Sequence, residues 1–229
     1  MRCRLAVALL AVLAMATTAA AEWTSKWTVL FPTPPQKTTL RPLPEFSING
    51  PHPGHAFYLG QFDADCSWKV DDGLLQPDGK NAALSLGEGE NFVMEGRLDA
   101  SGLGSWFLLV GDVDGRGYGL WNTTMIESGS PWGLFEYRGD RAIDGTAVDI
   151  ESYEWKGEQP FRLTVQDHAM TLEVGRRKVI DAVPMPNYTA GRVILGAYDT
   201  RYGPKKLKLR SLRVRSLPAT VKSVSDETP

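Results

Sequence analysis

Aromatic residues that stand beside charged ones are the part of this sequence best suited to binding chemistry. A sugar ring has an apolar C–H face and a polar rim, so a sugar site needs a flat Trp or Tyr beside fixed carboxylates, guanidiniums or amides. Several segments combine both kinds of side chain. On this ground we predict ligand-binding roles for Arg97, Trp121, Arg138, Tyr198, Asp199 and Arg201.

Two carboxylates, Glu95 and Glu136, are weak candidates for acid or base catalysis. Each precedes an arginine by two residues, Arg97 and Arg138, and residues two apart share a face of a strand. We expect both pairs on one concave sheet, as a polar patch with Trp121 or Tyr198 at its margin. The alternative is plain cross-strand ion pairing.

The segment Asp112-Val113-Asp114-Gly115 resembles the opening of a calcium loop, because alternating oxygen ligands before a glycine can wrap a hard cation. The rest of the ligand set of such a loop is absent. A hairpin turn is therefore the main prediction, and calcium held by Asp112 and Asp114 is the alternative; no other cofactor is expected. The three histidines are too few and too scattered to indicate a metal site or an activated nucleophile.

The start of the chain predicts export. Arg2 and Arg4 precede an apolar run, and Ala19 to Ala21 follow it, which is the pattern of a signal peptide over residues 1–21. The protein is then secreted or periplasmic, with Cys66 as its single cysteine, so its core must stabilise it without an internal disulfide. No later stretch reaches the roughly 20 apolar residues of a membrane span. The net charge of −2 gives no indication of nucleic-acid binding.

The elements that must position these side chains are strands. Short alternating or apolar runs are separated by Gly, Asp and Asn, and no window keeps a helical period. A bulge is expected between Leu209 and Leu212, where the alternation changes phase. The predicted strands are 56–62, 67–70, 82–86, 91–98, 105–111, 117–122, 132–138, 161–166, 169–174, 178–183, 191–197 and 206–216.

This pattern predicts an all-β fold, a two-sheet antiparallel β-sandwich, over residues 55–217. A Pro-rich segment, 22–54, precedes it and either lies on the surface or packs through Trp23, Trp27 and Phe31. A flexible tail, 218–229, follows. The basic residues between 205 and 215 alternate with leucines and valine, which is typical of the solvent-facing side of a strand. The predicted core comprises Trp68, Phe92, Met94, Leu163, Val165, Leu172, Val174, Val193 and Leu195.

Several segments resemble a known fold family. Residues 68–75 read Trp-x-Val-x-Asp-Gly-x-Leu, which is similar to the entry strand and turn of concanavalin A-like jelly-roll domains. The runs 161–165, 172–180 and 191–195 and the closing run 207–214 resemble strands of the 3-keto-disaccharide hydrolase domain family and its laminin-G-like relatives. The resemblance covers about residues 56–217, and it implies a jelly roll that binds or processes glycosides.

The polar motifs of that family are replaced here. Where the family usually carries Asn-Ser-Gly, Glu-x-Gln-Ile and Leu-Gln-x-His, this chain has the apolar stretches 104–108, 118–122 and 195–198. We therefore predict a carbohydrate-binding jelly roll that is non-catalytic or weakly catalytic. Two alternatives are an enzyme acting on 3-keto glycosides and a laminin-G-like adhesion or envelope module.

Overall fold

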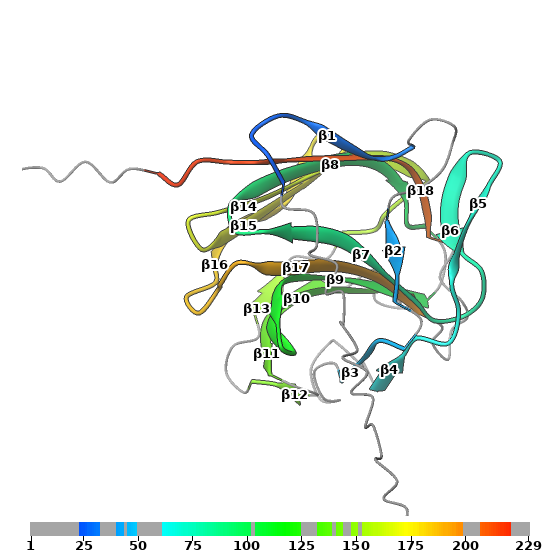
Figure 1. The fold of residues 1–229 in the computed structure, drawn as a ribbon, viewed down its shortest axis with the longest axis horizontal. Coiled ribbons are helices and arrows are strands. Elements are labelled where there is room, and N and C mark those ends of the chain that lie inside the picture. Colours follow the sequence, from blue (N-terminus) through cyan, green and yellow to red (C-terminus); the bar gives the residue numbers. More distant parts are fainter. Residues whose placement is uncertain are drawn as a thin grey trace, which may run out of the picture.

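The computed structural model describes residues 23–32, 40–43, 45–49, 61–101, 104–124, 132–138, 141–143, 148–150, 153–198 and 207–220. Within these residues the chain consists of antiparallel strands stacked in two layers, with a small two-stranded sheet below them (Figure 1). The predicted signal peptide and most of the predicted tail lie outside the described residues.

The first layer, sheet B, has the strand order β16-β15-β14-β8-β18-β6-β5, and β1 also pairs with β18. All of its pairings are antiparallel. Its strands are β1 (Thr28–Phe31), β5 (Trp68–Asp71), β6 (Leu74–Pro77), β8 (Phe92–Asp99), β14 (Glu158–Gln166), β15 (Ala169–Val174), β16 (Arg177–Pro184) and β18 (Lys208–Ser216).

The second layer, sheet A, has the strand order β12-β11-β10-β9-β17-β7-β2, and β13 also pairs with β11. Its strands are β2 (Arg41–Pro42), β7 (Ala82–Gly89), β9 (Gly104–Val113), β10 (Arg116–Thr124), β11 (Trp132–Arg138), β12 (Arg141–Ala142), β13 (Val148–Ile150) and β17 (Gly191–Tyr198). The hairpin of β3 (Ser47–Asn49) and β4 (Gln61–Asp63) forms the two-stranded sheet. β17 lies inside sheet A, between β9 and β7, and β18 lies inside sheet B, between β8 and β6.

The main core fills the space between the two sheets. Alternation delivers its side chains, as in β8, where Phe92, Met94 and Leu98 are buried while Glu95 and Arg97 face away from them. All nine residues of the predicted core are buried, which confirms the assigned strand phases. The register of β18 against β8 shifts between Leu209 and Ser211, so the predicted bulge is present.

A second apolar layer covers the outer face of sheet A. Phe107, Leu109, Trp121, Phe135 and Tyr137 point away from the main core. The β3–β4 hairpin packs on them through Ile48 and Phe62, so both faces of this sheet are apolar.

The described part of the Pro-rich segment belongs to the sandwich. Trp23 and Phe31 are buried in the main core, and β1 pairs with β18. The ring centres of Trp23 and Phe92 are 4.8 Å apart, and the two rings pack edge to face. Gly89 permits this approach, because a Cβ there would stand 2.6 Å from the Trp23 ring. Of the two predicted arrangements of this segment, packing through aromatic residues is the one seen in these residues.

Candidate functional site

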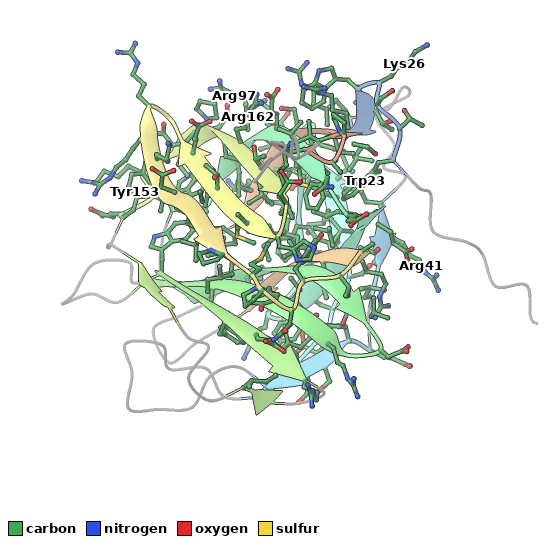
Figure 2. All side chains as sticks on the ribbon, turned by 90° about the vertical axis from the view of Figure 1, so that its left-hand side faces the viewer. Trp23, Lys26, Arg41, Arg97, Tyr153 and Arg162 are labelled. Carbon is green, nitrogen blue, oxygen red and sulfur yellow. The ribbon has the colours of Figure 1, made fainter. Side chains whose placement is uncertain are left out.

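A groove of about 820 Å³ lies on the outer face of sheet B. It crosses β8, β14, β15, β16 and β18, and β1 forms one rim. In Figure 2, Arg97 and Arg162 project together from this side of the molecule. Its charged lining comprises Glu95, Arg97, Arg162, Glu173, Arg176, Arg177, Lys178 and Arg213.

A row of alternating charges runs across the five strands of the groove. The register places in one line, from β16 to β18, Lys178, Glu173, Arg162, Glu95 and Arg213. Glu95 accepts hydrogen bonds from Arg162 and from Arg213, whose Nη2 lies 2.6 Å from Glu95 Oε2. The single carboxylate of Glu95 therefore holds two guanidiniums in place.

Another carboxylate, Glu158, lies beside the groove and also holds two guanidiniums. Arg97 Nε donates to Glu158 Oε1 at 2.7 Å, and Arg210 donates to the other oxygen. The hydrogen bonds from Arg210 and then Arg97 lower the pKa of the Glu158 carboxyl. Both bonds therefore persist in mildly acidic solution.

The rim formed by β1 is apolar. Val29, Phe31 and Pro32 line it, and Trp27 and Val29 are exposed to solvent. The guanidinium of Arg213 lies 4.3 Å from the centre of the Trp27 ring, and that of Arg215 lies 5.1 Å away. These cation–π contacts orient the indole beside the row of charges.

The opposite end of the groove is the hairpin turn between β15 and β16. Gly175 takes a φ of +62° at the first turn position, a conformation that favours glycine. Its amide donates to the Pro160 carbonyl at 2.8 Å, which ties the turn to β14. Arg176, the next residue, is thereby held at the edge of the groove with its side chain exposed.

A second hollow, of about 670 Å³, lies at one end of the sandwich, between the turns that follow β7 and β9 and the segment that precedes β17. Asp112 is buried there. Its Oδ1 accepts from the Tyr137 hydroxyl at 2.9 Å, and its Oδ2 accepts from Arg192 Nε at 2.8 Å. Burial, then the neighbouring Asp112 carboxylate, raises the pKa of Tyr137.

The predicted hairpin turn at residues 112–115 is confirmed. Asp114 and Gly115 have φ values of 50° and 72°, as a type I′ turn requires, and β10 begins at Arg116. Both oxygens of Asp112 accept bonds from protein groups. In the part of the chain that the structure describes, no cluster of three or more His, Cys, Asp or Glu side chains is placed to hold a metal ion.

The expected polar patch that joins Glu95 and Arg97 to Glu136 and Arg138 is wrong. Glu95 lies on β8 of sheet B and Glu136 on β11 of sheet A. Glu136 is buried, and its Oε2 accepts from the Asn187 side chain at 2.8 Å. Alternation fixes the face on which a side chain lies but not the sheet to which its strand belongs, and this is why the expectation failed.

The described residues among the other predicted ligand-binding positions belong to sheet A, away from the groove. Trp121 is buried between Phe107 and Phe135 in the outer layer of sheet A. Arg138 is exposed at the end of β11, and Tyr198 ends β17. Asp199 and Arg201 lie outside the described residues.

Arg97 is the predicted ligand-binding residue that lines the groove, and Glu95, a predicted acid or base, lines it as well. Sequence reasoning missed Arg162, Arg176 and Arg213. A signal for Arg213 was present, since its strand alternates basic and apolar residues, but that pattern also fits an ordinary solvent-facing strand.

Comparison with known proteins finds similar structures. No protein-family model matches the chain, and no curated protein matches its sequence. The structure is similar to the exoplasmic/lumenal domain of VIP36 in its Ca²⁺/Man-bound form, with a TM-score of 0.53 and 10% identity over 77% of this chain and 91% of that one.

Two further similar structures have lower TM-scores. Carbohydrate-binding module CBM66 from Bacillus subtilis has a TM-score of 0.49 and 12% identity over 86% of this chain and 99% of that one. A legume lectin-like domain from Entamoeba histolytica has a TM-score of 0.48 and 14% identity over 66% and 87%. The antiparallel sandwich and the likeness to the VIP36 domain define a two-sheet β-sandwich jelly roll of the concanavalin A-like type, which confirms the predicted fold class.

Proposed function

We propose that this protein is an exported carbohydrate-binding module that holds a glycan in the groove of sheet B. One observation carries the proposal: guanidiniums fixed by carboxylates line a hollow of about 820 Å³, and one of them, Arg213, orients the exposed indole of Trp27 beside it. A sugar needs this combination of polar rim and apolar face. The VIP36 domain, which shares the fold, was obtained in a Ca²⁺/Man-bound form.

Binding without catalysis is the form of the function that the site supports best. A retaining glycosidase needs two carboxyl groups about 5–5.5 Å apart, and an inverting one needs them about 6.5–9.5 Å apart. The predicted acid–base candidates lie in different sheets, and each accepts bonds from protein groups. Glu95 thus serves to position the guanidiniums of Arg162 and Arg213.

Export follows from the start of the sequence, where the signal-peptide pattern lies. In the described part of the chain, no helix is long and apolar enough to cross a membrane.

The experiment is a glycan array probed with the purified protein, with calcium and with a chelator, followed by titration of the best ligand. Trp27→Ala should weaken binding about two- to tenfold, because an aromatic face that stacks on a ligand contributes about 0.5–1.5 kcal/mol. The matched control is Val70→Ala, which removes an equally exposed apolar side chain from β5 of the same sheet and should leave affinity unchanged.

An array without a single glycan ligand would overturn the proposed function. Binding that survives Trp27→Ala unchanged would instead move the site away from this groove. Glycan binding that depends on calcium would instead favour a site at the end of the sandwich where Asp112 and Asp114 lie.

A further inference from the structure

We infer that the groove of sheet B binds an extended anionic glycan, with carboxylate or sulfate groups on every sugar unit or on every second one. The inference rests on the proposed function and specifies the chemical class of its ligand. It follows from the charge, the geometry and the exposure of the side chains that line the groove.

The charge of the lining is strongly positive. Six cationic side chains and two carboxylates line the groove, whereas the whole chain has a net charge of −2. Positive charge is therefore concentrated on this face, although the net charge of the whole chain is slightly negative. A surplus of cations in a hollow attracts an anion and disfavours a cationic ligand.

The chemical type of the cations matters as much as their number. Five of the six are arginines. A planar guanidinium presents its N–H groups as a fork that matches two oxygens of a carboxylate or a sulfate, whereas an ammonium acts as a point charge. The lining is thus suited to oxyanions rather than to negative charge in general.

The arginines are ordered and still accessible. Arg97, Arg162 and Arg213 are fixed by ion pairs to Glu158 or Glu95, yet their side chains remain 50%, 45% and 52% exposed. Each guanidinium has five N–H groups, and its ion pair uses only part of them. The remaining donors are available to a ligand at little cost in ordering the side chain.

The spacing of the cations indicates an extended ligand. In the row of alternating charges, the cations Lys178, Arg162 and Arg213 stand on every second strand. Neighbouring strands are about 4.7–4.9 Å apart, so these cations repeat about every 9–10 Å. Two sugar units of an extended chain cover about the same length, so a glycan lying across the strands meets a cation at every second unit.

A glycan is favoured over a nucleic acid by the apolar rim. Single-stranded nucleic acids are bound on successive aromatic platforms. Among the described residues of this rim, Trp27 is the exposed aromatic ring, while Phe31 is buried. One ring beside a row of guanidiniums fits a single stacked sugar at one end of an anionic chain.

The test measures binding of the purified protein to two matched pairs of polymers, dextran sulfate against dextran and polygalacturonate against its methyl ester. We expect binding to an anionic member and at least tenfold weaker binding to its neutral partner. The two anionic arms distinguish sulfate from carboxylate. Affinity should also fall when the ionic strength is raised, because the groove is open to solvent and screening shortens the reach of its charges.

Charge reversal locates the site. Arg176→Glu should weaken binding about tenfold, because it replaces an attraction at the edge of the groove by a repulsion. Arg116→Glu makes the same change at an exposed position on β10 of sheet A and should leave binding unchanged. Arg162→Gln is a second groove variant, for which circular dichroism and the melting temperature report whether the fold is kept.

The outcomes separate this inference from the proposed function. Equal binding of a neutral polymer and its anionic partner, unaffected by Arg176→Glu, would overturn the inference and leave carbohydrate binding intact. Binding to none of the four polymers and to no glycan of the array would overturn both. Equally tight binding of inorganic polyphosphate or single-stranded DNA would also overturn the inference, because the groove would then recognise charge without recognising a sugar.

Discussion

Asp112 is a buried carboxylate whose two oxygens are held by two residues far from it in the sequence. Tyr137 on β11 and Arg192 on β17 each donate to one of its oxygens. A buried charge left without partners is costly, so the three residues stabilise one another as a unit. Their bonds link three strands of sheet A at the end of the sandwich.

The raised pKa of Tyr137 leads to a prediction about alkaline stability. Burial keeps the phenol protonated in the folded state, whereas the unfolded chain loses the proton near its ordinary pKa of 10.0. Below about pH 10 the contribution to stability is fully present, and above it the unfolded state binds fewer protons, so stability falls as the pH rises. Each such proton changes the free energy of unfolding by about 1.4 kcal/mol per pH unit.

Tyr137→Phe is the variant that tests this linkage. At neutral pH it should cost about 1–3 kcal/mol, since Asp112 loses one buried donor. Above about pH 10 its stability should fall less steeply than that of the parent protein, as measured by urea unfolding at several pH values. Tyr188, whose pKa burial also raises, keeps part of the slope in both proteins. Equal slopes would contradict the assignment of Tyr137 as a titrating group.

At the scale of the strands, alternation predicted most of the elements. The runs between 82 and 138 and between 161 and 216 correspond to observed strands with small differences at their ends. β6 and the short strands β1, β2, β3, β12 and β13 were missed. Strands of two to four residues carry too little alternation to be recognised, and in β2 a proline also weakens the signal.

The candidate site was far less predictable than the fold. The groove depends on which strands are neighbours, and Glu95, Arg162 and Arg213 are far apart in the sequence but meet across three strands. Among the charged residues of the groove, the sequence predicted only Arg97 and Glu95 as site residues. Pairing order is decided by the packing of whole sheets, which a local pattern does not encode.

Strand phase can be tested with two neighbouring residues of β14. Leu163 is fully buried between the sheets, and Leu163→Ala should cost about 2–5 kcal/mol in the free energy of unfolding. Thr164, the next residue, points to the opposite face, so Thr164→Ala should change stability by less than about 1 kcal/mol. Similar losses in both variants, measured by chemical unfolding, would show that the assigned phase is incorrect.

At the scale of the whole molecule, the first described residues secure the sandwich. Trp23 packs in the main core, and backbone and side-chain bonds join Thr24 and Trp23 to Ser216 at the end of β18. The segment therefore covers the core at the place where the beginning and the end of the described chain lie side by side. This contact links residues that are 193 positions apart.

Trp23→Ala should destabilise the protein by about 3–5 kcal/mol, as expected for the loss of a buried indole. Trp27→Ala removes the same side chain from an exposed position in the same segment and should cost no more than about 1 kcal/mol. Thermal unfolding of the two variants gives the comparison. Comparable losses would mean that the segment contributes through its surface contacts rather than through the core.

The interior positions of β17 and β18 have a consequence for the rate of folding. Both strands follow all the other described strands in the sequence, yet β17 lies between β7 and β9, and β18 lies between β6 and β8. Each sheet is therefore joined through pairings between residues that are far apart in the chain. Such pairings must overcome the entropy of closing long loops before they are formed, so we expect the sandwich to fold slowly for its size.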